Sequence, residues 1–520
     1  MATSLSSQVS NKPVTPVRKA VQKADWTIML YIVADDVLTN FAVQSLRQLN
    51  LSASSAGSES EANVIVAAQF AFPGVEKRGS ATAHGEERYY IFRRSADTES
   101  RTHAKSNKDM AVENIAVAAD ANLAKKLVEP PASIQDPSSP PVSDVQGLKN
   151  FLDKVYKDDA LAAEHYALIL WGHGPELLLE SDSADPTTTC SSLYITPKDL
   201  REALTETASK HPKSHPPEII GFDACFMSMF EMALELEGTA KYMVASQDEV
   251  PDASFPYDNL IKLFRMNGKR QLPDLLKEGL HAYVSAYEDC ICNADTGMNE
   301  VTLSVLDLEK CNRLKNAIRS LACALLETEN DASFADVLIK ARSASQDYAT
   351  GLYVDLKQFC ANLSGKIGEV ERWRKIKDAC QDVVAALTKG KSQLLLDNTE
   401  EKRGGGISIY LPYLKTEQYA KVSRPLAKGG RITNGGKGFT EMLNGGATEY
   451  LMCARRTMIL DTESYYGDLR LAGTHWYDFI AKRWTKALIQ RVPADLDYHY
   501  SAQQSWINAT RPPARIARCD

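Results

Sequence analysis

Long apolar runs are missing from this sequence of 520 residues. No stretch reaches the roughly 18 consecutive apolar residues of a membrane-spanning helix, so we expect no membrane segment and no membrane partner. The first 24 residues also lack the apolar core of a secretory signal, because they are polar and interrupted by proline. With 44% hydrophobic and 24% charged residues, the chain is neither collagen-like nor wholly disordered. We therefore expect a globular, cytoplasmic protein in which residues 1–24 are a disordered leader.

A surplus of positive charge is also absent. Sixty basic residues against 67 acidic ones give a net charge of −7, which does not favour a function based on nucleic-acid binding. The ten cysteines are scattered, and the close pair Cys290 and Cys292 has no second pair at zinc-ribbon spacing. We expect no metal site and mostly reduced thiols, as in a cytoplasmic protein.

Short, uniformly apolar segments alternate with amphipathic ones along most of the chain. Uniformly apolar runs rich in β-formers are typical of strands that are buried on both faces. The predicted strands are 26–33, 63–69, 166–171, 218–222, 242–245 and 406–411. Strands that alternate with helices predict an α/β fold, in which helices sandwich a mostly parallel β-sheet. The region after 258 is predicted to be a largely helical C-terminal elaboration.

Composition also suggests how the chain is divided. The stretch 95–143 is rich in Ser, Asp, Lys and Pro, and it predicts an exposed insertion. The predicted parts are a leader over 1–24, a core over 25–257 that contains this insertion, a mainly helical subdomain over 258–400, a remaining core strand and closing helix over 401–490, and a tail over 491–520.

Reactive side chains follow two of the predicted strands. His173 lies between two glycines just after strand 166–171, and Cys225 comes shortly after strand 218–222. Active sites of open α/β sheets lie at the carboxyl ends of the strands, so the two side chains face each other if the strands are neighbours. An imidazole within reach of a thiol activates it as a nucleophile. A single cysteine after a strand is more often simply buried, but the pair of residues favours catalysis.

The surroundings of Cys225 support this interpretation. A helix predicted over 227–236 places Cys225 just before a helix N-terminus, whose partial positive charge favours a thiolate. The backbone amides of Gly174 and Cys225 are expected to form an oxyanion hole for the reaction intermediate. The glycines beside His173 allow an unusual backbone and close approach of a substrate.

These residues lie in blocks that resemble the clostripain family of cysteine peptidases, family C11, which belongs to the caspase-like clan with gingipain, legumain and separase. The resemblance implies a caspase-like α/β core and a His–Cys dyad at His173 and Cys225. It also implies cleavage after Arg or Lys in protein or peptide substrates. The blocks are WTIMLYIVADDVLTNFAVQSLRQL at 26–49, YALILWGHGPE at 166–176, IIGFDACFMSMFEMALEL at 219–236, YMVASQDEVPDASFPYDNLI at 242–261 and GGGISIYLP at 404–412.

A basic P1 side chain requires a carboxylate in its pocket. Asp223, two residues before Cys225, matches a pocket acid of the family, although it is also placed to cap the following helix. Asp248, Glu249 and Asp252 are candidates for a second acid. Family members tend to have Pro-Gly-x-Gly in this loop, whereas this chain has Pro-Asp-Ala-Ser, so the choice between these acids stays open.

Activation and cofactors are further expectations from the resemblance. Family members are often zymogens that are cut at a basic residue shortly after the catalytic histidine, but the loop 176–197 contains no Lys or Arg. We therefore expect any activating cut in the insertion 95–143, which has several basic residues.

We expect that the enzyme requires no cofactor. Some relatives depend on calcium, and the loop 179–185 offers carboxylates for a weak calcium site, although such a loop is more commonly just solvated.

Two other function classes remain as alternatives. One is a catalytically silent caspase-like module that regulates or binds a protein partner. Retention of both His173 and Cys225 favours the enzyme, because a silent module needs neither. A regulatory or activating protein partner is compatible with both hypotheses. The other is a nucleotide-binding protein, but the glycine-rich segment 434–438 lacks the first glycine and the Ser/Thr of a phosphate loop.

Overall fold

The computed structural model describes residues 23–33, 38–54, 60–72, 86–92, 145–174, 195, 197–211, 215–251, 254–288, 301–348, 353–398, 404–411, 413, 470–484 and 487. Several predicted features lie outside these residues. They are the leader up to residue 22, the insertion 95–143, the loop 179–185, Cys290, Cys292, Asp252 and the tail 491–520.

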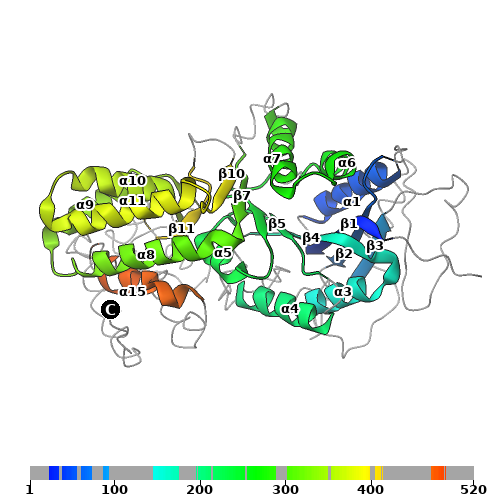
Figure 1. Ribbon diagram of the computed structural model, residues 1–520, viewed down its shortest axis with the longest axis horizontal. Coiled ribbons are helices and arrows are strands. Elements are labelled where there is room, and N and C mark those ends of the chain that lie inside the picture. Colours follow the sequence, from blue (N-terminus) through cyan, green and yellow to red (C-terminus); the bar gives the residue numbers. More distant parts are fainter. Residues whose placement is uncertain are drawn as a thin grey trace, which may run out of the picture.

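An eight-stranded sheet forms the centre of the molecule (Figure 1), with strand order β10-β7-β6-β5-β4-β1-β2-β3. Strands β6, β5, β4, β1 and β2 run parallel, whereas β3, β7 and β10 pair antiparallel with their neighbours. The strands are β1 (Ala24–Val33), β2 (Val64–Phe72), β3 (Glu86–Phe92), β4 (Ala163–Trp171), β5 (Ile219–Asp223), β6 (Tyr242–Ala245), β7 (Ser304–Asp307) and β10 (Leu395–Asn398). The predicted mostly parallel α/β sheet is confirmed.

Helices cover both faces of this sheet because its central strands are apolar on both sides. Along β1, Met29 and Tyr31 belong to one buried cluster together with α3 and α4. The alternate residues Ile28 and Leu30 belong to a second cluster with α1, α6 and α7. These helices are α1 (Thr39–Ser54), α3 (Val145–Lys157), α4 (Pro197–Lys210), α6 (Tyr257–Asn267) and α7 (Leu272–Glu288), and a short 3₁₀ helix, η2 (Asp159–Leu161), precedes β4.

The largely helical C-terminal part begins later than the sequence suggested. Helices α6 and α7 cover the main sheet, where Ile261 and Leu275 share a buried cluster with Trp26. The separate helical group at the other end of the molecule starts after β7, and α8 is its first long helix (Figure 1). It contains η4 (Leu308–Lys310), α8 (Cys311–Leu326), α9 (Ala332–Ser343), α10 (Leu356–Ile367), η6 (Glu371–Trp373), α11 (Arg374–Thr388), η7 (Arg470–Thr474), α15 (Trp476–Asp478) and η8 (Phe479–Trp484). No helix within the described residues is long and apolar enough to cross a membrane.

The predicted last strand of the core belongs to a second sheet instead. This three-stranded sheet has the order β11-β9-β8 and consists of β8 (Asp347–Tyr348), β9 (Tyr353–Asp355) and β11 (Ser408–Tyr410). Gly406, with φ of +85°, turns the chain just before β11 and packs against Leu395, where a side chain would clash. An isolated parallel bridge between Met229 and Ser408 joins the second sheet to the segment that follows β5.

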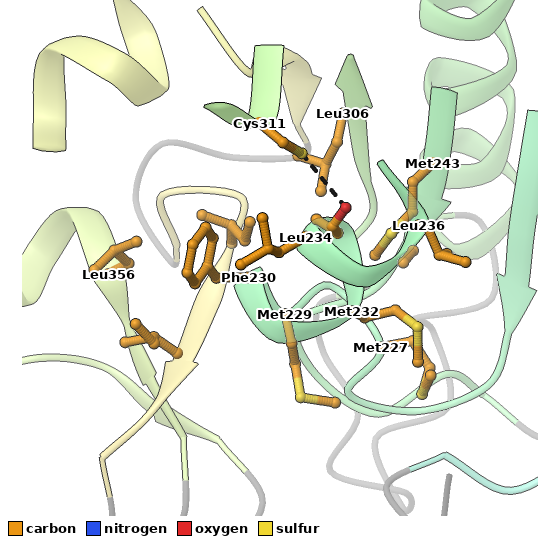
Figure 2. Close-up of a cluster of buried hydrophobic side chains, with 14 of the residues drawn as sticks. Met227, Met229, Phe230, Met232, Leu234, Leu236, Met243, Leu306, Cys311 and Leu356 are labelled. Atoms are coloured by element: carbon orange, nitrogen blue, oxygen red, sulfur yellow. Dashed lines mark hydrogen bonds between the residues drawn. The ribbon is translucent and has the colours of Figure 1, made fainter. Parts of the chain in front are cut away.

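The short helix α5 (Phe230–Leu236) lies in the middle of the core, and all of its residues are buried. Figure 2 shows apolar side chains around it, including Met227 and Met229 from the segment before the helix. The thiol of Cys311 donates a hydrogen bond to the backbone oxygen of Ala233 at 3.4 Å, drawn as a dashed line in Figure 2. The chain therefore passes from the end of β5 directly into a well-packed core.

Candidate active site

The two strands that carry the predicted dyad are neighbours in the main sheet. Strand β4 pairs with β5 in parallel, and Trp171 at the end of β4 is aligned with Asp223 at the end of β5. The backbone amide of Gly172 continues this pairing and donates a 3.2 Å hydrogen bond to the oxygen of Asp223. His173 and Cys225 each lie two residues beyond the aligned pair, and both are half-buried. The structure thus brings them to the same place at the carboxyl edge of the sheet.

The two glycines beside His173 allow backbone segments to approach each other. A Cβ atom at Gly174 would overlap the backbone of Cys225, so these two residues are in direct backbone contact. A Cβ atom at Gly172 would lie 2.8 Å from the carbonyl oxygen of Val33 at the end of β1. Close substrate approach was the expected reason for these glycines, whereas in the structure the close neighbours are other strand ends.

The thiol of Cys225 is held by the loop that follows β6. The backbone amide of Val250 donates to Sγ at 3.3 Å, and the thiol lies 3.8 Å from the oxygen of the same residue. The next residue, Phe226, adopts a left-handed φ of +59° and donates its amide to the backbone oxygen of Asp248 at 3.0 Å. An N–H group directed at sulfur favours the thiolate, because it stabilises the negative charge.

The prediction that a helix begins just after Cys225 is wrong. Helix α5 starts only at Phe230 and has 7 residues, so its partial charge does not act at the thiol. The preceding segment is held in an extended form by β11. Ser408 donates its amide to the oxygen of Ser228 at 2.9 Å, and the hydroxyl of Ser228 donates to the oxygen of Gly406 at 2.7 Å. The second sheet therefore binds Ser228 and Met229, which the apolar pattern had assigned to the helix.

Asp223 is buried, with 4% of its surface exposed. Its Oδ2 accepts hydrogen bonds from the Tyr257 hydroxyl at 2.7 Å and from the Phe255 amide at 3.1 Å. Burial raises the pKa of Asp223 to about 7, because it disfavours the charged carboxylate more than these two hydrogen bonds favour it. The side chain does not cap the following helix, which was the alternative role considered for it.

The segment that binds Asp223 is itself fixed to neighbouring elements. Trp171 donates its indole N–H to the hydroxyl of Ser254 at 2.7 Å. Ser254 has a left-handed φ of +67°, and its backbone oxygen accepts a hydrogen bond from the hydroxyl of Tyr287 on α7. The side chain of Asp223, at the end of β5, is therefore bound by the segment 254–257, and this segment is bound in turn by α7.

The candidates for a second acid have different surroundings. The Asp248 carboxylate accepts from the amide of Glu249 at 2.9 Å. Glu249 is exposed, and Asp252 lies outside the described residues. Asp248 thus contacts the segment that carries Cys225 through its backbone oxygen, which accepts a hydrogen bond from the Phe226 amide.

Sequence reasoning missed the residues that hold the site by backbone or by distant contacts. Val250 acts through its amide, which no side-chain pattern reveals. Tyr257 lies in a sequence block that resembles the family, but its bond to Asp223 depends on how α6 packs. Gln247 donates to Asp355 from the second sheet, 108 residues away. Within the described part of the chain, no group of three or more His, Cys, Asp or Glu side chains is arranged to hold a metal ion.

Comparison with known proteins adds to this picture. A model of the clostripain family, peptidase C11, matches residues 30–420. No curated protein matches the chain significantly. Among solved structures, an inactive zymogen C11 protease from Parabacteroides distasonis has 16% identity and a TM-score of 0.43, and the match covers 75% of this chain and 93% of that chain. A secreted C11 cysteine protease from Bacteroides thetaiotaomicron, in complex with an irreversible peptide inhibitor, has 16% identity, a TM-score of 0.43 and coverages of 78% and 97%.

Identities of 16% do not carry the substrates of those proteases over to this chain. The family match is a separate observation, since it extends over well more than half of the 520 residues. It runs from within β1 to beyond β11 and includes both His173 and Cys225. The chain therefore belongs to the clostripain family of cysteine endopeptidases.

Proposed function

We propose that the chain cleaves proteins or peptides after Arg or Lys. Cys225 is the nucleophile, His173 is its acid–base partner and Asp223 binds the basic P1 side chain. The observation that carries this proposal is the parallel alignment of β4 and β5, which brings the residues after Trp171 and Asp223 to one edge of the sheet. The direct backbone contact between Gly174 and Cys225 supports it.

The reaction follows from these positions. The thiol proton passes to the imidazole of His173, and Sγ of Cys225 attacks the scissile carbonyl carbon to form a C–S bond. The backbone amides of Gly174 and Cys225 donate to the negatively charged oxygen of the intermediate. The C–N bond then breaks as the imidazole gives its proton to the leaving nitrogen. Water hydrolyses the resulting thioester, which releases the new carboxyl group and restores the thiol.

The environment of Asp223 supports a basic P1 preference. Only Oδ2 accepts hydrogen bonds from the described residues, so Oδ1 is available to a cation. The buried carboxylate has a pKa of about 7, and an arriving guanidinium or ammonium group compensates the charge that burial disfavours. An uncharged P1 side chain offers no such compensation.

The test compares peptides that differ only at P1, with Arg, Lys or norleucine. Cys225→Ala is expected to lower turnover by about 1,000-fold or more, and His173→Ala by about 100-fold or more. Asp223→Asn is expected to reduce the preference for Arg and Lys over norleucine by about 10- to 100-fold, because a charged hydrogen bond is lost. Assays with added calcium and with a chelator determine whether calcium contributes.

A thiol-reactive inhibitor with Arg at P1 separates this proposal from the silent module. Labelling of Cys225 in the wild-type protein, and none in Cys225→Ala, is the expected result. No turnover and no labelling, with or without calcium, would instead favour a module that acts by binding a partner.

We also propose that the enzyme is made as a zymogen and that its activating cut falls within 95–143, because the loop 176–197 has no Lys or Arg. The fragments of purified wild-type protein are to be identified by N-terminal sequencing, with Cys225→Ala as the uncut control. A self-cleavage site within 176–197 would contradict this part of the proposal.

A further inference from the structure

Tyr283 carries a hydroxyl that needs an explanation. The residue lies on α7, and 1% of its surface is exposed. Its hydroxyl is buried and has no hydrogen-bond partner among the described residues. A buried hydroxyl without a partner destabilises the folded protein, because it has lost its hydrogen bonds to water. A ligand that supplies the missing hydrogen bond is one reason for keeping such a group.

The ring of Tyr283 packs on the segment that binds Asp223. It meets the ring of Phe255 edge to face, with 5.5 Å between ring centroids, and the Phe255 amide donates to Asp223. It also meets the ring of Tyr287 at 5.1 Å, and the Tyr287 hydroxyl donates to the backbone oxygen of Ser254. Both partners of Tyr283 therefore belong to the surroundings of the proposed P1 acid.

The charges of Asp223 and Cys225 also act on Tyr283. Burial raises its pKa, and Tyr287, Asp223 and Cys225 raise it further, in this order. Of the two oxygens of Asp223, Oδ2 already accepts two hydrogen bonds, and Oδ1 accepts none from the described residues. Oδ1 of Asp223 and the hydroxyl of Tyr283 are thus two polar atoms that lack a hydrogen-bond partner among the described residues.

We propose that the Tyr283 hydroxyl accepts a hydrogen bond from a P1 guanidinium whose charge is bound by Oδ1 of Asp223, and that it thereby favours Arg over Lys at P1. This inference rests on the proposed binding of a basic P1 side chain by Asp223. A guanidinium carries five N–H donors in a planar fork, so it reaches a carboxylate and a hydroxyl at the same time. The ammonium of Lys is a compact charge, and one carboxylate oxygen and water satisfy it.

The test is Tyr283→Phe, which removes the hydroxyl and keeps the ring. A matched control is Tyr156→Phe on α3, since the Tyr156 hydroxyl is also buried and without a partner among the described residues. Tyr156 packs in the cluster on the opposite face of the main sheet from Tyr283. We expect both variants to keep or raise the melting temperature, because each loses a buried polar group that was not paired.

Activity is to be measured with matched Arg-P1 and Lys-P1 peptides. Inhibition is to be measured with agmatine and cadaverine, which carry the two cations without a scissile bond. Tyr283→Phe is expected to lower kcat/KM for the Arg peptide by about 10-fold and to weaken inhibition by agmatine by a similar factor. Its values for the Lys peptide and cadaverine should stay within about 3-fold of the wild type, and Tyr156→Phe should change none of them.

Other results overturn the inference. Unchanged agmatine inhibition, or equal losses for the Arg and Lys probes, would show that the hydroxyl does not select the guanidinium. Asp223→Asn serves as the reference for the proposed function itself. If that variant keeps the wild-type preference for basic P1 residues, the assignment of Asp223 fails and this inference fails with it. If only Tyr283→Phe is without effect, the role of Asp223 stands.

Discussion

The side-chain amide of Gln247 donates a 3.0 Å hydrogen bond to Oδ2 of Asp355, and the two residues are 108 positions apart. Gln247 also accepts from the amide of Gly406 at 2.8 Å, and Asp355 accepts from the amide of Gly405. Both side chains are buried. Because Gln247 lies in the loop after β6 that contacts Cys225, the second sheet holds this loop in position.

Gln247→Met is therefore expected to slow catalysis. The variant fills the same space but removes both hydrogen bonds, and it leaves a buried carboxylate at Asp355 with fewer donors. A shift of the loop moves the amide of Val250 away from the thiol of Cys225. We expect kcat/KM and the rate of Cys225 alkylation by iodoacetamide to fall by about 10- to 100-fold, with a smaller change in KM.

A control separates positioning from general loss of stability. Thr328→Ala removes the buried hydroxyl that accepts from Arg483 at 3.1 Å near the end of α8, away from the loop after β6. It should lower the melting temperature without slowing alkylation of Cys225. Equal slowing in Thr328→Ala, or no slowing in Gln247→Met, would rule out the positioning role.

Gly174→Ala tests the contact between the two strand ends. The added methyl group would overlap the backbone of Cys225, so the ends of β4 and β5 must move apart. We expect a loss of about 1–3 kcal/mol in the free energy of unfolding and at least a 100-fold loss of kcat/KM. Gly365→Ala in α10 is the control, because nothing lies within 4 Å of its Cβ position. It should stabilise the protein by roughly 0.5–1 kcal/mol and leave turnover unchanged. Normal turnover in Gly174→Ala would contradict the close contact.

Binding of a P1 cation should depend on pH through Asp223. Its pKa of about 7 means that the carboxyl is mostly protonated and uncharged at pH 6, and mostly ionised at pH 8. The affinity for agmatine should therefore rise with pH across this interval and level off above it. The measurement is competitive inhibition, which does not require that the thiol react.

Asp223→Asn provides the control for this titration. The variant should bind agmatine weakly and with little dependence on pH between 6 and 8. Parallel pH profiles for the wild type and the variant would mean that another group, present in both proteins, controls binding.

Much of the fold could be predicted because the main sheet is buried on both faces. Strands such as β1 and β4 have no polar face, and their apolar runs mark them clearly in the sequence. The position of β11 could not be predicted in this way. Its three residues are all buried, like those of a strand in the main sheet, and its partner is decided by the turn at Gly406 and by the contact with Ser228.

The sequence pointed to the residues that contribute side chains to the candidate site. It did not point to those that contribute only backbone groups. His173 and Cys225 stand out because each follows an apolar run directly. The donor that contacts the thiol is the amide of Val250, and any residue except proline provides one. The incorrect start of α5 has a related cause, since the mostly apolar residues 227–229 fit a helix as well as the extended segment that pairs with Ser408.

Glu231 on α5 is a second buried carboxyl with a raised pKa. Its Oε1 accepts from the amide of Tyr410 at 2.9 Å, while Oε2 is buried and has no partner among the described residues. Burial raises its pKa to about 7. The folded state then binds more protons than the unfolded state between about pH 4.5 and 7, so stability from this group is lost as the pH rises through that window.

Glu231→Gln should remove this dependence, because the amide keeps the shape and the acceptor for Tyr410 but does not ionise. Between pH 5 and 8, the free energy of unfolding of the wild type should fall relative to the variant by up to about 3 kcal/mol. Urea denaturation at several pH values measures the difference, in which titrations common to both proteins, such as that of Asp223, cancel. Glu369→Gln is the control, since Lys377 lowers the pKa of Glu369 and moves its titration below this window. If the curves for Glu231→Gln and the wild type run parallel, Glu231 is already ionised in the folded protein at pH 5.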